Sequence, residues 1–215
     1  MKDVKELIKS ILPEITDLRH RLHQIPEIGF SEYETSALIR EFLDRTGAEI
    51  LPPVLGTDVT ALIKGAGNPD RTILLRADMD ALPITENTEL PYRSKKPGFA
   101  HSCGHDGHMA ILLELARRLS GKPRLANNVQ LLFQPAEESV AGGKALVEAG
   151  YLEKYPVDEA FALHGWPGEK TGFIRFCRGP IMASTEDFEI TLSGPGGHGA
   201  MPHLACDLIG ASAGF

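Results

Sequence analysis

The sequence has few of the features that mark secreted, membrane-spanning or disulfide-bonded proteins. Its three cysteines, Cys103, Cys177 and Cys206, are an odd number and lie far apart, which excludes a disulfide framework. Residues 1–13 mix charges with apolar side chains, and no uninterrupted apolar run follows them. The sequence therefore predicts neither a signal peptide nor a membrane span, and the expected location is cytoplasmic, in a reducing compartment.

An excess of positive charge is also missing. The formal net charge is −7, whereas a nucleic acid or an anionic membrane surface would favour a basic patch, so neither is expected as a partner. Repeats and low-complexity segments are absent, and hydrophobic residues make up 42% of the chain, spread along its length. A buried core is therefore expected, in one domain or in one domain and part of another.

What the sequence does contain is an alternation of short apolar strands with helices. Helical spacing of apolar residues over 4–22, restarted at Pro13, predicts a first helix, and a capping box of Ser31 and Glu34 opens a second. The remaining periodic segments are strands over 59–63, 72–77, 129–133 and 160–164, and helices over 105–119 and 143–149. This order predicts an α/β fold, a sandwich around a mostly parallel central sheet.

The pattern of residue types changes after Gly179. Residues 188–192 alternate like a strand, residues 194–199 form a glycine-dense loop, and a helix is expected from Cys206 onward. We therefore expect a first domain over residues 1–183 and the beginning of a second over 184–215.

Residues with metal-binding chemistry follow the predicted strands. In an open α/β sheet, ligands bind beyond the carboxyl ends of the strands. Asp78 and Asp80 follow one strand, Glu137 and Glu138 follow another, and His164 ends a third. A cysteine and several histidines precede the long helix over 105–119. This convergence predicts a site at one edge of the sheet.

Cys103 and His105 are separated by one glycine at the start of that helix. A thiolate and an imidazole in such a turn can both face a divalent ion of the zinc type. An isolated Cys-x-His is also compatible with a buried thiol beside capping histidines. His101 and His108 flank the pair and could support it without touching the ion.

Glu137 and Glu138 are adjacent carboxylates after an apolar strand. Neighbouring strand residues point to opposite sides, but a bend at Pro135-Ala136 can aim both into one cleft. One carboxylate can then hold an ion while the other accepts a proton from water. The alternative is a solvated acidic loop.

Three further residues complete the candidate set. Asp80 can orient a ligand histidine, His164 is a strand-end histidine that is structural or a ligand, and His198 lies in the glycine-dense loop. Arg76 and Asp78 are compatible with a plain salt bridge, and His198 with a passing residue in a hairpin turn. Each of these features alone is weak evidence for a metal site. Their occurrence together, in this order along the chain, makes the evidence strong.

Five segments in this order resemble successive signatures of one family. They are residues 76–83 (RADMDALP), 102–108 (SCGHDGH), 134–138 (QPAEE), 164–167 (HGWP) and 196–203 (GGHGAMPH). The chain resembles the amidohydrolase branch of the aminoacylase and glutamate-carboxypeptidase metallopeptidases, which includes hippurate hydrolases, auxin-conjugate hydrolases and N-acetyl-diaminopimelate deacetylases. The resemblance runs from residues 19–23 to the end of the chain. It implies a zinc-peptidase-like three-layer α/β sandwich carrying an inserted α+β lid domain.

The resemblance also implies a role for each candidate residue. Cys103 would bridge two divalent metal ions, manganese or zinc, with His105 and His164 on one ion and Glu138 on the other. Glu137 would be the general base that activates the attacking water and returns the proton to the leaving nitrogen. His198 would stabilise the tetrahedral oxyanion across a dimer interface, and Asp80 would orient a ligand histidine. The implied reaction is hydrolysis of the amide bond of N-acyl or N-aroyl amino acids, small molecules whose acyl group the sequence leaves open.

In the family, the chain passes through the lid and returns to the catalytic sheet with one further metal-binding histidine. No histidine of this sequence matches it, so we expect the chain to be a fragment of a longer, homodimeric enzyme and inactive alone. A second interpretation is a truncated, inactive metal-binding or interaction module. A third is a cysteine hydrolase with Cys103 as nucleophile and His105 as base, which would leave the glutamates unexplained.

Overall fold

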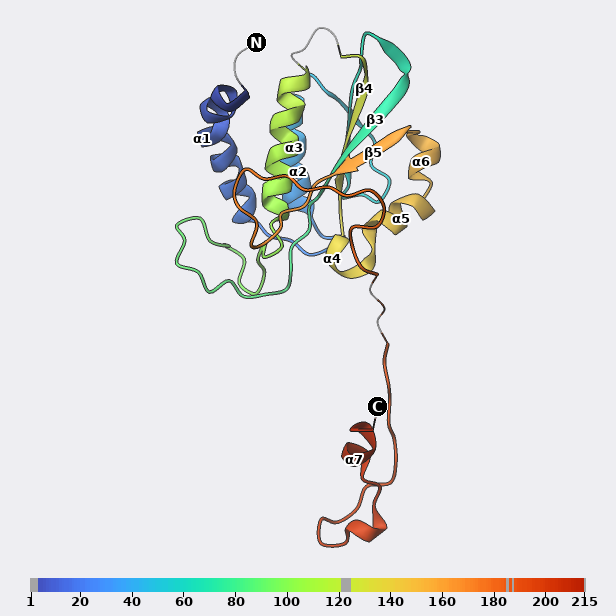
Figure 1. Ribbon diagram of the computed structural model, residues 1–215. Helices are drawn as coiled ribbons and strands as arrows, with labels where there is room; N and C mark the ends of the chain where they lie inside the picture. Colours follow the sequence, from blue (N-terminus) through green and yellow to red (C-terminus); the bar gives the residue numbers. More distant parts are fainter. Residues whose placement is uncertain (1–3, 121–124, 185, 187, 215) are drawn as a thin grey trace. The chain divides into compact units, whose positions relative to one another are not determined.

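The computed structural model describes residues 4–120, 125–184, 186 and 188–214. They form two compact units, Met1–Pro167 and Gly168–Phe215. The first unit contains the sheet, most of the helices and all but one of the predicted site residues (Figure 1). Among the described residues, no helix has both the length and the apolar character needed to cross a membrane.

The centre of the first unit is a sheet with the strand order β1-β2-β4-β3-β5. The strands are β1 (Glu49–Leu51), β2 (Val59–Ile63), β3 (Asn68–Asp78), β4 (Asn127–Gln134) and β5 (Glu159–Ala162). β3 pairs in parallel with both β4 and β5, whereas β2 is antiparallel to both β1 and β4. Only β2 therefore runs against the other strands, and the predicted mostly parallel α/β sheet is confirmed.

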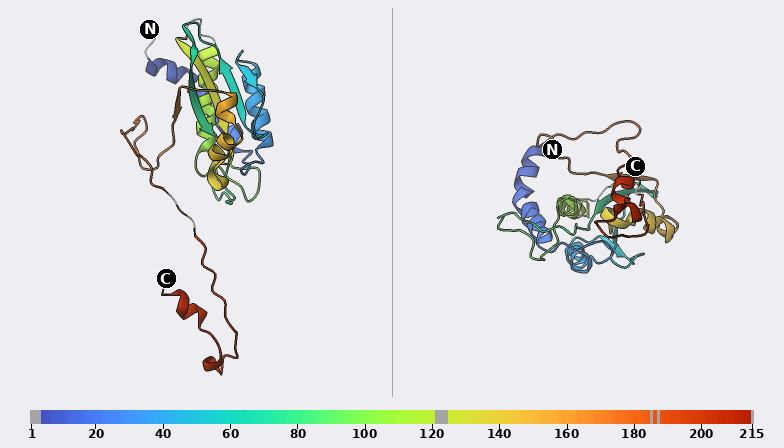
Figure 2. Two further views of the ribbon diagram at one scale, coloured as in Figure 1. Left: turned by 90° about the vertical axis from the view of Figure 1, so that its right-hand side faces the viewer. Right: turned by 90° about the horizontal axis from the view of Figure 1, so that it is seen from below.

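One face of the sheet is covered by α1 (Val4–His23), α2 (Tyr33–Asp44) and α3 (His105–Ser120), as the view from below shows (Figure 2). The alternation of side chains along β2 and β4 directs one set of residues to this face. These strand residues pack against apolar stripes of all three helices. Together with the helix residues they form the larger core, which includes Leu18, Leu22, Ile39, Leu43, Val59, Ala61, Ile63, Met109, Leu113, Leu131 and Phe133.

The opposite face carries a smaller core under α5 (Gly142–Glu148) and α6 (Tyr151–Lys154). Leu74 and Leu132 point to this side, where they pack with Leu146 and Tyr151. Two helical layers thus enclose the sheet, which gives a three-layer arrangement within this unit. The one-turn helix α4 (Glu137–Val140) follows β4 directly and carries the two candidate glutamates.

Two predicted helix features are wrong. The first helix does not restart at Pro13 but runs through it, because its later apolar residues stay packed against α3. The capping box of Ser31 and Glu34 does not form, since α2 begins after Glu32 without a side-chain cap. Instead, the carboxylate of Glu27 accepts hydrogen bonds from the amides of Glu34 and Thr35, which satisfies the first turn of the helix.

In the second unit, the described residues include the 3-10 helix η1 (Pro202–Leu204) and the short helix α7 (Leu208–Ser212). The helix expected after Cys206 is present, capped by Asp207, whose carboxylate accepts from the amide of Gly210 at 2.8 Å. Residues 188–192 form no strand, because no described segment of this unit pairs with their backbone. The lid domain over 184–215 stays a prediction.

Candidate metal centre

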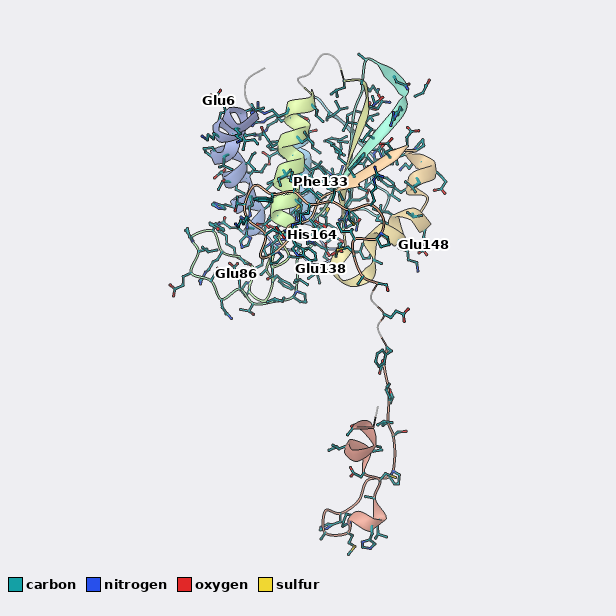
Figure 3. All side chains as sticks on the ribbon, viewed as in Figure 1. Glu6, Glu86, Phe133, Glu138, Glu148 and His164 are labelled. Carbon is teal, nitrogen blue, oxygen red and sulfur yellow. The ribbon has the colours of Figure 1, made fainter. Side chains whose placement is uncertain are left out.

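The candidate residues of the first unit meet at the carboxyl ends of the parallel strands. Asp78 at the end of β3 lies opposite Gln134 at the end of β4, and Arg76 on β3 lies opposite Ala162 at the end of β5. Glu138 lies four residues after the end of β4 and His164 two residues after the end of β5, and they lie near each other beyond the sheet (Figure 3). The parallel register therefore gathers residues far apart in the sequence at one edge.

His105 lies at the centre of this cluster of residues, and its side chain is 0% exposed. Its Nδ1–H donates to the main-chain oxygen of Asp80 at 2.9 Å. This bond leaves Nε2 with a free lone pair, 3.7 Å from Glu138 Oε1 and 3.9 Å from Glu137 Oε2. Among the described residues, neither His105 Nε2 nor Glu138 Oε1 has a hydrogen-bond partner. Buried polar atoms are nearly always paired, so two that face each other without partners fit a site for an ion or water.

His164 also directs its Nε2 toward this cluster, although that nitrogen, unlike Nε2 of His105, has a hydrogen-bond partner in the Cys103 thiol. Its Nδ1–H donates to the main-chain oxygen of Gly165 at 2.7 Å, and its Nε2 lies 3.4 Å from Cys103 Sγ. Ligand histidines typically donate one ring N–H to a carbonyl or carboxylate and present the other nitrogen to the metal. We call Cys103, His105, Glu138 and His164 the open group, because their ligand atoms face one another and two of them, His105 Nε2 and Glu138 Oε1, have no hydrogen-bond partner among the described residues.

The electrostatics of the open group favour a cation. Burial and the neighbouring carboxylate of Glu138 raise the pKa of the Cys103 thiol to about 12. Burial lowers the pKa of His105, but its hydrogen bond to Asp80 and the negative charge of Asp78 outweigh that effect and raise it. A divalent ion supplies the positive charge that these groups lack, and it deprotonates a coordinating thiol. The thiol, imidazole and carboxylate donors suit zinc-like ions, and the residues present fit such an ion.

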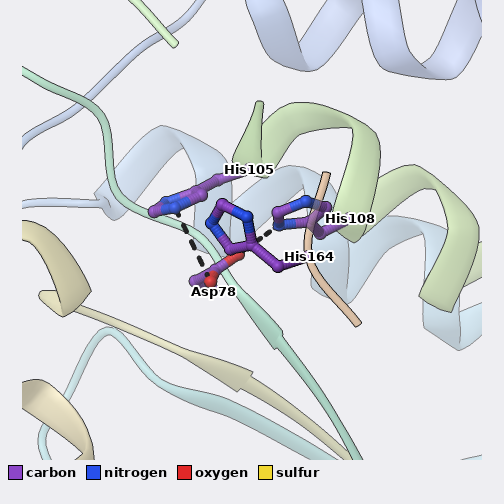
Figure 4. A group of neighbouring side chains, drawn as sticks. All are labelled: Asp78, His105, His108 and His164. Carbon is purple, nitrogen blue, oxygen red and sulfur yellow. Dashed lines mark hydrogen bonds and ion pairs between the residues drawn. The ribbon is translucent and has the colours of Figure 1, made fainter. Parts of the chain in front are cut away.

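A second group of neighbours has its polar atoms satisfied. His108 Nδ1–H donates to Asp78 Oδ1 at 2.6 Å, and His108 Nε2 accepts from the amide of Gly165 at 2.9 Å. Asp78 Oδ2 accepts from Arg76 at 2.8 Å, so the predicted salt bridge is present. Figure 4 shows Asp78 linked by dashed lines to both His108 and His105, whose Nε2 lies 3.6 Å from Asp78 Oδ2. We call Arg76, Asp78 and His108 the paired group.

The paired group is close enough to the open group to be mistaken for part of a metal site, because ligand atoms of Asp78, His105, His108 and His164 lie within 4.8 Å of one another. Both ring nitrogens of His108 are nevertheless engaged, which leaves no lone pair for an ion. Burial raises the pKa of Asp78, but the bond from His108 and the positive charges of His105 and Arg76 outweigh it and lower the value to about 2. His108 therefore links β3 to the segment that carries His164.

The turn before the two glutamates has the bend expected at Pro135-Ala136. Ala136 adopts a left-handed conformation with φ 55° and ψ 45°, which is uncommon for a residue other than glycine. Both Glu137 and Glu138 consequently approach His105. The amide of Glu138 donates to Asp80 Oδ2 at 2.9 Å, so Asp80 holds this turn as well as the imidazole of His105.

The structure brings Asp80, Cys103, His105, Glu137, Glu138 and His164 together in the first unit. His198 belongs to the second unit, where its Nδ1 accepts from the amide of Ala200 at 3.1 Å.

Two further buried polar residues are Asp106, which was not predicted, and His101, which was expected to support Cys103 and His105. Asp106 accepts from both His23 and Arg19, at 2.8 and 3.0 Å, and so ties α1 to the start of α3. His101 is buried, and neither of its ring nitrogens has a partner among the described residues; burial lowers its pKa to about 4. The basic residues at helical spacing in residues 19–23 could have indicated the contact of Arg19 and His23 with Asp106.

Comparison with known proteins agrees with this geometry. The chain is 41% identical over 212 residues to a hippurate hydrolase of Campylobacter jejuni, covering 94% of this chain and 54% of the relative. It is 40% identical over 206 residues to an N-acetyldiaminopimelate deacetylase of Listeria monocytogenes, covering 95% of this chain and 55% of the relative. The chain thus spans about half the length of the curated relatives it matches.

Solved structures are similar as well. A dinuclear metal binding peptidase of the M20 family from Bacillus subtilis matches with a TM-score of 0.70 and 41% identity, covering 74% of this chain and 44% of that one. An aminohydrolase from Staphylococcus aureus matches with a TM-score of 0.74 and 33% identity, covering 97% and 55%. The model of peptidase family M20/M25/M40 matches residues 74–203, which include every candidate site residue. The chain therefore belongs to peptidase family M20/M25/M40.

Proposed function

We propose that this chain supplies the metal-binding half-site of a metal-dependent amidohydrolase that cleaves the amide bond of N-acyl or N-aroyl amino acids. The observation that carries the proposal is the open group, in which His105 Nε2 and Glu138 Oε1 face each other unpaired beside a thiol and a second imidazole. The hippurate hydrolase and deacetylase names of the relatives support the substrate class.

In this proposal, Cys103, His105, Glu138 and His164 would hold two divalent ions. The ions supply Lewis acidity that polarises the carbonyl of the scissile amide. Zinc and manganese are the two candidates, because the thiol and imidazoles suit zinc whereas the carboxylate is also suited to manganese.

Glu137 is the general base of the proposed reaction. Its side chain is 41% exposed, compared with 18% for Glu138, although both lie at a similar distance from His105. The more exposed carboxylate can reach both water and substrate. It removes a proton from the attacking water and later delivers that proton to the leaving nitrogen, which yields a carboxylic acid and an amino acid.

Two further residues assist this chemistry. Asp80 keeps His105 in the tautomer that presents Nε2, through its main-chain oxygen at 2.9 Å. His198 is assigned the role of stabilising the oxyanion, as the resemblance implies. Homodimerisation through residues of the second unit and a cytoplasmic location belong to the same proposal.

The cysteine hydrolase is disfavoured by the surroundings of Cys103. Its sulfur is hydrogen-bonded to Nε2 of His164 at 3.4 Å, whereas Nδ1 of His105, the expected base, is bonded to Asp80. The raised pKa of the thiol also opposes formation of the thiolate nucleophile in the absence of an ion. Such an enzyme would lose activity on alkylation and resist chelators, whereas the metallohydrolase is inactivated by chelators.

The test is hydrolysis of N-acetyl-, N-benzoyl- and indole-acetyl-amino acids after loading with manganese or zinc. Both the 215-residue chain and the complete reading frame that carries it should be assayed. Glu137→Gln should lower kcat roughly 10²–10⁴-fold, the range for loss of a general base. Glu148→Gln, an exposed glutamate on α5, is the matched control and should leave kcat unchanged. Metal binding without turnover in either protein would contradict the hydrolase and favour the metal-binding module.

A further inference from the structure

A buried carboxylate that does not belong to the open group contacts the turn that carries both glutamates. Glu32 is 0% exposed and immediately precedes α2, yet it does not cap that helix. Its Oε1 accepts from the amide of Ala136 at 2.9 Å, and its Oε2 accepts from the hydroxyl of Thr57 at 2.9 Å. The carboxylate thus bridges the loop before β2 and the end of β4.

The turn at Ala136 needs such a support. A left-handed conformation at a residue with a Cβ is strained, and it persists only where surrounding contacts impose it. The amide of Gly142 donates to the main-chain oxygen of Ala136 at 2.8 Å, so both polar groups of Ala136 are held. A Cβ at Gly142 would lie 1.8 Å from the oxygen of Pro135, which leaves no room for another residue there.

Burying a carboxylate is costly unless hydrogen bonds offset the cost. Burial raises the pKa of Glu32, and the groups that offset this effect are hydrogen bonds from the backbone of Glu32, Ala136 and Phe30 and from the Thr57 side chain, with no cation among them. A hydrogen bond from an amide to an ionised carboxylate is, however, about twice as strong as one between neutral groups. The position therefore favours fixing the Ala136 amide over packing an apolar side chain.

We propose that Glu32, braced by Thr57, is a positioning residue that fixes the left-handed turn at Ala136 and thereby directs Glu137 and Glu138 toward His105. This inference rests on the proposed function for the roles of the two glutamates. Glu32 touches neither the ligand atoms nor the reacting atoms, so it acts only through the backbone turn.

The first experiment compares cobalt(II) binding by the 215-residue chain and its variants, read from the cobalt absorption spectrum. Glu32→Ala should weaken binding roughly 10–100-fold, the range for loss of a partner that orients a ligand. Glu32→Gln should bind within about 3-fold of the wild type, because the amide oxygen still accepts from Ala136 and the amide nitrogen can donate to Thr57. Thr57→Val should lie between the two.

Matched controls separate positioning from general loss of stability. Thr60→Val removes a buried hydroxyl that bonds to Tyr151, away from the turn. Glu114→Ala removes a buried carboxylate that pairs with Arg117 and Arg118 on α3. Both should lower the free energy of unfolding while leaving cobalt affinity unchanged. Equal weakening by the controls, or cobalt affinity unaffected by Glu32→Ala in a folded chain, would overturn the proposal.

A second readout does not depend on metal. In Glu32→Ala, amide hydrogen exchange over residues 136–142 should accelerate relative to the rest of the first unit, and in Thr60→Val it should not. If the wild-type chain bound no cobalt, the proposed metal function would fail, yet exchange would still decide whether Glu32 holds the turn. Unchanged exchange in Glu32→Ala would reject the positioning role on its own.

In the complete reading frame, Glu32→Ala should lower kcat by roughly 10²-fold while KM changes little, since a small displacement of a catalytic group can cost that much. Glu32→Gln should restore most of the rate. A change confined to KM would contradict the proposal, because the turn positions the general base and not a substrate-binding surface.

Discussion

Two histidines one helical turn apart at the start of α3, both buried, have opposite hydrogen-bonding states. His108 has both ring nitrogens paired, one with Asp78 and the other with the amide of Gly165. His105 has one nitrogen paired with the main-chain oxygen of Asp80, and its other nitrogen is unpaired among the described residues. Since both rings are buried, the Nε2 of His105 without a hydrogen-bond partner is what distinguishes it from His108 as a residue available for an ion.

The same contrast separates the open group from the paired group. In the paired group, Arg76, Asp78 and His108 satisfy one another and connect β3 to the segment after β5. In the open group, His105 Nε2 and Glu138 Oε1 have no hydrogen-bond partner among the described residues, whereas the Cys103 thiol pairs with His164. A site is thus recognised less by which residues gather than by which of their polar atoms are left without partners.

The largest effect should come from the open group. His105→Ala should weaken cobalt binding by more than the roughly 10–100-fold that loss of an orienting partner causes. His20→Ala is the matched control, because this ring stacks on Tyr92 outside both groups. Calorimetric titration measures the cobalt affinity of both variants. If folded His105→Ala bound cobalt as tightly as the wild type, the open group would not differ from the paired group as a metal site.

A smaller effect is expected from the paired group. His108→Ala should weaken cobalt binding roughly 10–100-fold by releasing the segment that carries His164. The cost should not add to that of His164→Ala, because His108 acts through that residue. The cobalt affinities of the two single variants and of the double variant complete a double-mutant cycle, which measures how far the two losses add. Fully additive losses would show that His108 contacts the ion itself.

Removing the charge of the paired group should affect stability more than binding. Asp78→Asn keeps an acceptor for His108 but loses the ion pair with Arg76. Loss of a hydrogen bond between charged groups costs about 1.5–3 kcal/mol of unfolding free energy. Urea unfolding should show this loss, with cobalt affinity changed less than in His108→Ala. A larger change in affinity than in stability would place Asp78 among the ligands.

The smallest effect concerns pH and a third fully paired group, the carboxylate of Glu32. Burial raises its pKa above the ordinary value of 4.5. As the pH falls from neutral through the raised pKa, the folded wild type takes up a proton before the unfolded chain does. The wild type should therefore gain stability relative to Glu32→Gln over that window. Urea unfolding at several pH values measures the difference, and the opposite slope would mean that the folded state lowers this pKa.

Much of the fold could be predicted because hydrophobic periodicity reports it directly. The strand β2 has the predicted bounds, 59–63, and α3 begins at the predicted residue, His105. The short elements β1, α4 and α6 were not predicted, since three or four residues are too few to show a period. The expected strand at 188–192 had the right alternation, but alternation cannot supply a pairing partner.

The candidate site was predictable in composition but not in detail. The strand ends and the motifs identified which residues meet. They could not show which of His105 and His108 keeps a free nitrogen, because that depends on a contact with Gly165, 57 residues further along the chain. Glu32 was not predicted either, since a glutamate before a helix resembles an ordinary capping residue until the fold brings it to Ala136.

The most direct test of the account is the absorption spectrum of the 215-residue chain titrated with cobalt(II). We predict a thiolate-to-cobalt charge-transfer band in the wild type that disappears in Cys103→Ser and persists in Cys177→Ser, a cysteine of the second unit. Absence of the band in the folded wild type, or its persistence in Cys103→Ser, would contradict the claim that the open group is a metal centre.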